Sequence, residues 1–132
     1  MPRSRFALLA ILILAALPAR AADPFRGKDD EEIVAQIEAA VENQKAPEGF
    51  GAALATLLNK PDAGIRARER AAWAMGELGY KPGAPALLTA AGHKGLLIRS
   101  AALGALARLR PDAALPIFVN TAETDPILAL RQ

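Results

Sequence analysis

The 132-residue sequence contains no cysteine and one histidine, His93. Without thiols the chain forms no disulfide and no thiolate metal site, and it has no cysteine for lipid or haem attachment. One histidine cannot supply a multi-histidine metal centre. We also find no carboxylate pair supported by a base or nucleophile, no glycine-rich phosphate loop and no acyl-transfer constellation. The sequence therefore predicts a protein that is not an enzyme and has no catalytic, cofactor or metal site.

Long apolar runs are absent except near the start of the chain. Residues 1–21 have the organisation of a secretory signal peptide: Arg3 and Arg5 precede an uncharged run over 6–17, and Ala19 to Ala21 offer the small residues of a cleavage site. No later segment approaches the roughly 20 apolar residues of a membrane span. We expect export to the periplasm or the extracellular space, cleavage after Ala21, and no membrane contact afterwards. The alternative is a leader retained as an anchor.

An excess of charge of one sign is also lacking once the leader is removed. The whole chain has 16 Lys+Arg and 14 Asp+Glu, and three of the arginines lie in the leader. A nearly neutral exported chain does not have the basic footprint of a nucleic-acid-binding protein, so we expect no nucleic-acid partner. Residues 22–48 nevertheless carry eight acids and three basic residues, whereas residues 60–110 carry nine basic residues and three acids. Either this asymmetry of charge steers a charged partner to the protein, or the two segments only form faces exposed to solvent.

The sequence does contain an internal repeat. An aliphatic residue followed by arginine recurs at spacings of 33 and 32 residues, at Ile65–Arg66, Ile98–Arg99 and Leu130–Arg131. Alanine-rich segments follow the first two pairs, and a shift of 31 residues aligns Met75 with Leu106 and Pro85 with Pro116. Such self-similarity is typical of stacked repeat proteins.

The repeats have a helical period. Apolar residues recur at spacings of three and four in both alanine-rich segments, and strand signals are nearly absent. We predict helices over 29–44, 49–59, 65–79, 84–91, 96–109 and 113–122, and an incomplete one from 126. Neither helix of a pair can bury its apolar stripe alone, so the pairs must stack. The sequence predicts an all-α, α-α solenoid of about three and a half repeats over 29–132, after the signal peptide 1–21 and a linker at 22–28.

The segments 62–66, 71–79 and 84–88 together resemble a HEAT repeat of the short kind also found in phycobilisome-lyase-like proteins. Residues 98–109 and 114–116 are similar to a second copy, and the resemblance covers about 50–132. It implies a scaffold or binding module rather than an enzyme. In such repeats an acid and an arginine link neighbouring repeats, and this structural ladder is fitted by Asp62, Arg66, Arg99, Asp125 and Arg131. The second copy lacks an acid where Asp62 predicts one.

Trp73 is the candidate partner-binding residue. If the stripe that includes Met75 faces inward, Trp73 points outward among Glu69, Arg70 and Glu77. Tryptophan is enriched among the residues that dominate binding energy. The alternative is that Trp73 packs along the preceding helix or stacks under Arg70 in a cation–π contact.

The two ends of the predicted solenoid differ. Residues 29–44 provide a polar cap at the N-terminal side, whereas the C-terminal side leaves Ile117, Phe118 and Leu128 exposed. We expect either that the sequence belongs to a longer repeat protein or that its last repeat docks on a partner or on a second copy of itself. The most consistent function is a non-enzymatic exported helical-repeat scaffold that binds another protein. The alternative is an accessory or regulatory module of an envelope enzyme complex.

Overall fold

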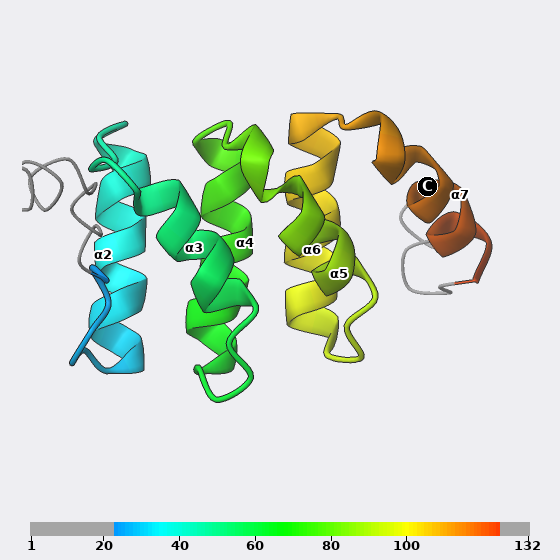
Figure 1. Ribbon diagram of the computed structural model, residues 1–132. Helices are drawn as coiled ribbons and strands as arrows, with labels where there is room; N and C mark the ends of the chain where they lie inside the picture. Colours follow the sequence, from blue (N-terminus) through cyan, green and yellow to red (C-terminus); the bar gives the residue numbers. More distant parts are fainter. Residues whose placement is uncertain (1–22, 125–132) are drawn as a thin grey trace, which may run out of the picture.

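The computed structural model describes residues 23–124, which form six α-helices and two 3₁₀ turns without a β-strand (Figure 1). In chain order they are α2 (Asp30–Glu42), α3 (Phe50–Leu58), α4 (Ile65–Glu77), η1 (Lys81–Gly83), α5 (Ala84–Ala91), α6 (Leu96–Leu109), η2 (Asp112–Ala114) and α7 (Leu115–Thr124). The all-α prediction is confirmed. The predicted bounds match for α5 and α6 and differ by one or two residues for the others. The predicted signal peptide and the helix from 126 lie outside the described residues.

The helices stack in two layers, as expected for an α-α solenoid. Helices α2, α4 and α6 stand side by side in one layer, α3 and α5 lie in front of α4 and α6, and α7 follows at the C-terminal end (Figure 1). Helix α4 packs against α2, α3 and α6, and α5 packs against α6. Helix α4 therefore buries its apolar residues against helices on both of its sides as well as against α3.

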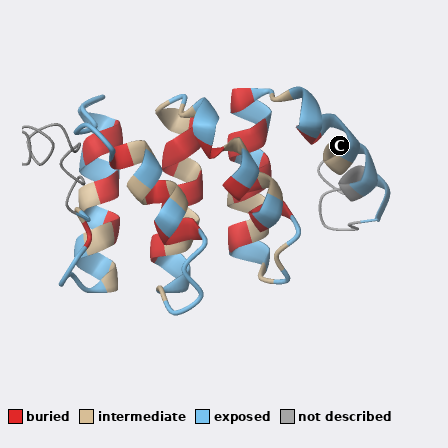
Figure 2. Cartoon of the chain, in the orientation of Figure 1, coloured by how far each residue is buried: buried red, intermediate tan, exposed pale blue. Residues whose placement is uncertain are grey.

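The hydrophobic core lies between the layers and along the contacts of α2, α4 and α6 (Figure 2). Met75 and Leu106, which the repeat aligns, both have an exposed fraction of 0%. Alanine and glycine line the contact between α4 and α6, where a Cβ added at Gly76 would lie 2.7 Å from Cα of Ala105. The small residues therefore set a close approach of these two helices.

Helix α2 is the first of the helices that the structure describes, and it is polar on one side. It begins with a capping box in which the Asp29 carboxylate accepts from the Glu32 N–H and the Glu32 carboxylate accepts from the Asp29 N–H, both at 2.9 Å. Ile37 and Val41 are buried, whereas the acidic residues on the opposite side of the helix face solvent.

The segment before α2, which we expected to be a linker, is packed on the first helices. Phe25 has an exposed fraction of 6%, and its ring lies 5.6 Å from that of Phe50, centroid to centroid, at 58°. The Asp23 carboxylate accepts a hydrogen bond from the Phe25 N–H at 3.0 Å and holds the local turn. Residues 23–28 are therefore part of the folded unit. The pairing of two aromatic rings accounts for the difference from the predicted linker.

Candidate functional site

Trp73 does not protrude freely from α4. It is half-buried against the core, and the guanidinium carbon of Arg70 lies 4.9 Å from the centroid of its ring. Nε of Arg70 also lies 3.2 Å from a carboxylate oxygen of Glu38 on α2 and 3.5 Å from one of Glu69. The structure therefore shows the stacked arrangement under Arg70 that was the alternative to an outward anchor.

Ion pairs join neighbouring repeats along this layer. Arg70 pairs with Glu38 across α2 and α4, and Nη2 of Arg108 lies 2.9 Å from Oε1 of Glu77 across α4 and α6. The paired residues are 32 and 31 positions apart, which is the period of the repeat. Partly exposed pairs of this kind contribute about 0.2–1 kcal/mol each. Of the four predicted partner-binding residues, Glu69, Arg70 and Glu77 thus already have partners within the chain, and Trp73 is covered on one side.

Two of the predicted ladder residues, Asp62 and Arg66, do not make these links within residues 23–124. Asp62 and Arg66 are exposed, and within residues 23–124 neither side chain forms a hydrogen bond or an ion pair. Nη1 of Arg99 donates to the carbonyl oxygens of His93 at 3.4 Å and Lys94 at 3.5 Å, which closes a loop of its own repeat. The remaining two predicted members, Asp125 and Arg131, lie outside the described residues. The resemblance placed the links at the starts of helices, whereas the observed ion pairs lie further along α2, α4 and α6.

Asp30 supplies a second link between repeats. Its Oδ1 accepts a hydrogen bond from the N–H of Ala67 at 3.3 Å, so a carboxylate of α2 caps the start of α4. The N-cap residue of α4 is Gly64, which has no side chain to do this, and a Cβ at Gly64 would lie 2.0 Å from Oδ1 of Asp30. The glycine therefore makes room for the acid of the neighbouring helix.

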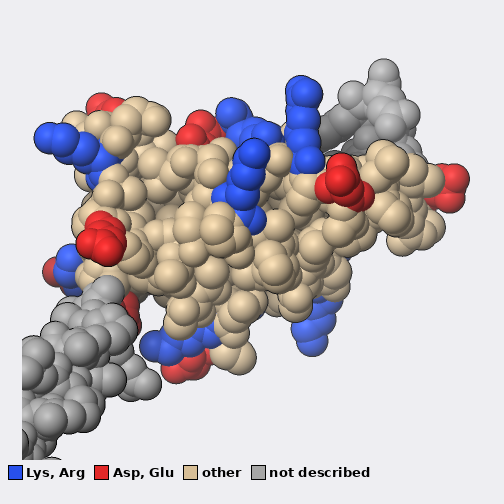
Figure 3. All heavy atoms as spheres, turned by 45° about the horizontal axis from the view of Figure 1, so that its top comes forward, with Lys and Arg blue, Asp and Glu red and all other residues tan. Residues whose placement is uncertain are grey.

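Charge is segregated between the two layers. Helices α2 and α4 each contain five charged residues and α6 contains two, whereas α3 and α5 contain none and α7 contains Glu123 alone. The solvent-exposed positions of α3, α5 and α7 include Ala52, Thr56, Pro85, Thr89, Leu115 and Val119, which we call the uncharged face. In Figure 3 most of the visible charged side chains lie along the edges of a broad region of other residues. A partner can cover α3 and α5 without desolvating a charge, whereas on α7 the exposed Glu123 lies on the same side of the helix as Leu115 and Val119.

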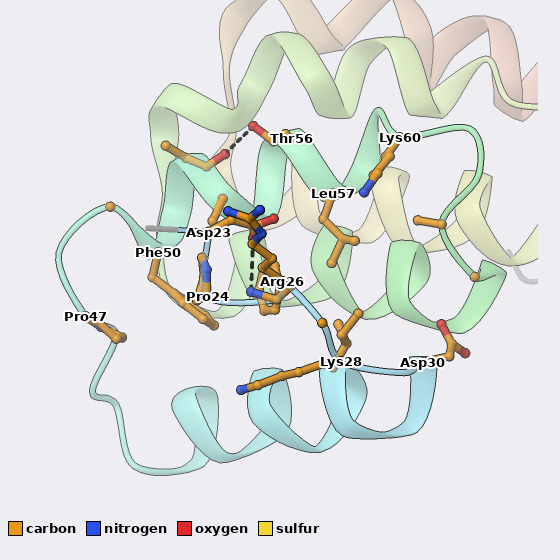
Figure 4. A pocket seen from close by; sticks show the side chains of 18 of the residues that line it. Asp23, Pro24, Arg26, Lys28, Asp30, Pro47, Phe50, Thr56, Leu57 and Lys60 are labelled. Carbon is orange, nitrogen blue, oxygen red and sulfur yellow. Dashed lines mark hydrogen bonds between the residues drawn. The ribbon is translucent and has the colours of Figure 1, made fainter. Parts of the chain in front are cut away.

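A groove of about 770 Å³ lies at the N-terminal end of this face (Figure 4). Its walls are the segment 23–28 with the start of α2, the turn 47–49, helix α3 and the loop 60–64. Phe25, Phe50 and Leu57 are buried residues that line it, and Arg26 and Lys60 are exposed residues on its walls. A cavity of this size falls within the range of ligand-binding clefts.

The described residues show no arrangement typical of metal chemistry. Residues 23–124 contain no group of three or more His, Cys, Asp or Glu placed to hold a metal ion. His93 is half-buried in its loop, where its Nδ1 accepts a hydrogen bond from the N–H of Gly95 at 2.8 Å. Over the same residues, each helix is too short or too polar to cross a membrane.

The comparison with known families matches the architecture. A family model of HEAT repeats covers residues 51–132. The chain belongs to the HEAT-repeat family. Neither the curated proteins nor the solved structures that we compared with this HEAT-repeat protein gave a match. HEAT repeats commonly serve as protein-interaction scaffolds and are typically not catalytic.

The matched region places the groove within this HEAT-repeat protein. The match begins at Gly51, in the first turn of α3, so α3 and the loop 60–64 belong to the HEAT repeats. The opposite wall, residues 23–33, precedes the matched region. The groove therefore forms where the N-terminal element packs against the first matched helix, and the periodic pattern of the repeats does not predict it.

Proposed function

We propose that this HEAT-repeat protein is an exported, non-enzymatic scaffold that binds another protein through the uncharged face of α3, α5 and α7. The observation that carries this proposal is the segregation of charge between the two layers of the solenoid. The cores of protein interfaces are depleted of charged residues, because a buried unpaired charge is costly. Solenoids of stacked repeats also bind partners over surfaces that extend across several repeats.

The opposite layer is the weaker candidate for a binding surface. Its ion pairs, Glu38 with Arg70 and Glu77 with Arg108, already join the helices of that layer. A partner that engaged these side chains would compete with contacts that hold neighbouring repeats together. The exposed side chains of the uncharged face take no part in these ion pairs, so they are available to a partner.

Affinity capture with charge-introducing variants tests the proposal. The purified protein is used as bait in an envelope extract, beside Thr89→Glu on the uncharged face and Ala35→Glu on α2, two exposed positions on opposite layers. We expect Thr89→Glu to lose the captured partner and Ala35→Glu to retain it, with unchanged circular dichroism for both. Retention by Thr89→Glu together with loss by Ala35→Glu would place the binding surface on the charged layer instead.

Export is a separate part of the proposal. It is supported by the basic start, the uncharged run and the small residues of positions 1–21. Mass spectrometry of the protein recovered from cells of its source tests it. We expect an envelope-derived polypeptide that begins at Ala22, and recovery of the intact Met1 form from the cytoplasm would contradict export.

The same face supports self-association at the C-terminal repeat. Leu115 and Val119, one turn apart on α7, have exposed fractions of 67% and 50%. Exposed apolar patches of this kind mark association surfaces. We expect sedimentation velocity to show a concentration-dependent dimer that Val119→Asp converts to a monomer. A wild-type protein that stays monomeric at high concentration would rule out this contact between copies.

A further inference from the structure

Exposed aliphatic side chains lie at one edge of the stack, where α4 and α6 begin. Contacts between equivalent positions show that α2, α4 and α6 run in the same direction, and their first turns lie along the lower edge in Figure 1. Ile65, the first residue of α4, has an exposed fraction of 60%. Leu96 and Leu97, the first two residues of α6, have exposed fractions of 42% and 59%. Among the described residues, this edge therefore holds three of the five exposed large hydrophobic side chains.

Packing within the protein does not account for this exposure. Ile98, in the same turn of α6, is buried in the core, whereas Ile65, Leu96 and Leu97 belong neither to the core nor to the partly buried residues packed against it. The 31-residue shift of the repeat aligns Ile65 with Leu96, so the exposed aliphatic residue recurs at the start of both helices. Clustered apolar side chains that remain in water mark an association surface.

Cations accompany these aliphatic residues. The segments 59–68 and 92–99 contain the two loops and the first turns of α4 and α6, and they carry one acid, Asp62, and five cations: Lys60, Arg66, Arg68, Lys94 and Arg99. Neither first turn contains an acid. Residues 78–111, which include α5 and α6, contain five Lys or Arg and no Asp or Glu. The edge is therefore positive around the exposed leucines of α6.

The acids of this edge lie at its other end, where α2 begins. Residues 29–32 are all Asp or Glu. Asp29 and Glu32 accept hydrogen bonds from each other's N–H groups, and Asp30 accepts one from the N–H of Ala67. Since these acids repel other anions, an anionic surface is attracted to the starts of α4 and α6 rather than to the start of α2.

The shape of the edge suits a flat partner. Ile65, Leu96 and Leu97 stand at the starts of parallel helices, and none of them lines the groove beside α3. A row of exposed helix starts offers no cavity for a side chain of a partner, whereas each of them can enter a bilayer surface, which is planar and adapts to its shape. Apolar side chains beside cations are the combination that binds anionic bilayers, because the apolar groups enter the headgroup region and the cations attract the phosphates.

We infer that the edge formed by the starts of α4 and α6 docks on an anionic phospholipid surface. Leu96, Leu97 and Ile65 enter the headgroup region, and Lys94 and Arg66 lie against the lipid phosphates. We expected no membrane contact from the sequence because no segment after the leader is long enough to span a bilayer, but a surface contact requires no span. This edge shares no residue with the uncharged face, so a docked protein can bind its partner at the same time.

Co-sedimentation with vesicles tests the inference. The protein used begins at Ala22, so that the apolar run over 6–17 does not itself enter the bilayer, and it retains the folded residues 23–124. One set of vesicles contains equal parts of phosphatidylglycerol and phosphatidylcholine, and the other contains phosphatidylcholine alone. Circular dichroism first confirms that each variant is helical.

Two pairs of variants separate the edge from the rest of the surface. Lys94→Glu is compared with Lys81→Glu, which makes the same change of charge in η1, after the end of α4. Leu97→Gln is compared with Ala107→Gln, which places a glutamine near the other end of α6. All four positions are exposed, so the substitutions leave the core intact.

We expect the wild type to sediment with the phosphatidylglycerol vesicles and to stay in solution with phosphatidylcholine alone. A cation close to an anionic surface strengthens binding about fivefold, so Lys94→Glu should weaken it about tenfold or more, and Lys81→Glu should have a much smaller effect. Leu97→Gln should weaken binding about fivefold by removing apolar surface from the contact, whereas Ala107→Gln should not. Raised salt should weaken binding of the wild type.

Three results would overturn the inference. They are equal binding to both kinds of vesicle or to neither, equal weakening by Lys94→Glu and Lys81→Glu, and unchanged binding of Leu97→Gln. If the wild type binds no vesicle and Lys94→Glu loses the partner in the capture experiment, the edge contacts an acidic protein instead of a membrane.

This inference goes beyond the scaffold function and fails independently of it. If no vesicle is bound while Thr89→Glu still abolishes partner capture, the membrane contact is wrong and the scaffold proposal stands. If the vesicles are bound as expected while Thr89→Glu has no effect on capture, the edge docks as inferred and the uncharged face does not bind the partner.

Discussion

Replacing Gly76 by alanine measures how closely α4 and α6 approach, because the added Cβ would lie 2.7 Å from Cα of Ala105. The obstructing atom belongs to the backbone, so no side-chain rotation relieves the contact and the helices must move apart. Gly104 in α6 provides a matched control: it is also a glycine inside a helix, but a Cβ there meets no atom within 4 Å.

Replacing glycine by alanine should therefore change the free energy of unfolding in opposite directions at Gly76 and Gly104. Alanine is favoured over glycine in a helix by about 1 kcal/mol, so Gly104→Ala should raise the free energy of unfolding by roughly 0.5–1 kcal/mol. At Gly76 overpacking costs about 1–3 kcal/mol, which exceeds the gain in helix propensity. We expect Gly76→Ala to be less stable than Gly104→Ala by about 2 kcal/mol, or about 8 °C in Tm.

Urea and thermal unfolding followed by far-ultraviolet circular dichroism provide the measurement. Both variants should keep the helical spectrum of the wild type, so that the comparison concerns stability alone. A Gly76→Ala protein that is stabilised as much as Gly104→Ala would refute the close α4–α6 contact and the role of small residues in the core.

Three further results are expected. Met75→Ala should lower the free energy of unfolding by about 2–5 kcal/mol, because Met75 has an exposed fraction of 0%. Unchanged stability would show that Met75 is not part of the core. Asp30→Ala and Gly64→Ala should each cost about 1 kcal/mol, and the double variant should cost little more than either one, since both disrupt the same hydrogen bond; additive losses would argue against it. Arg70→Ala should increase iodide quenching of Trp73, the single tryptophan, by uncovering its ring, and equal quenching would show that Arg70 does not shield it.

The fold was predictable because its signals are periodic. A shift of 31 residues aligns Met75 with Leu106, and each lies on a stripe of apolar residues spaced by three and four. These stripes determine which side of α4 and α6 is buried, and burial follows them in the structure. Prolines and glycines between the stripes end the helices close to the predicted positions.

The two observed ion pairs between repeats involve residues outside the predicted ladder. The resemblance to HEAT repeats implied links at Asp62 and Arg66, both of which are exposed. A better indication of a link between repeats is an acid that is followed one repeat later by an arginine, as in Glu38 and Arg70. Equivalent positions of adjacent parallel helices lie side by side, so these two side chains can pair. The capping of α4 by Asp30 was harder to predict. Its only indication in the sequence is that the helix begins after a glycine, which has no side chain to cap it.

The periodic pattern of the sequence does not predict the groove. It depends on Phe25, an isolated aromatic residue in a short non-periodic segment, and its burial follows from a contact with Phe50 that only the folded chain creates. The uncharged face, by contrast, was readable in the sequence. The predicted helices over 49–59 and 84–91 contain no charged residue, whereas the helices on the other layer do.

Hydroxyl-radical footprinting of the HEAT-repeat protein, free and in complex with its captured partner, tests the central claim most directly. If the uncharged face is the binding surface, the partner should protect Pro85, Leu115 and Val119 and leave the reactivity of Trp73 unchanged. Protection of Trp73 with unaltered reactivity along α5 and α7 would contradict the claim and assign the interaction to the charged layer.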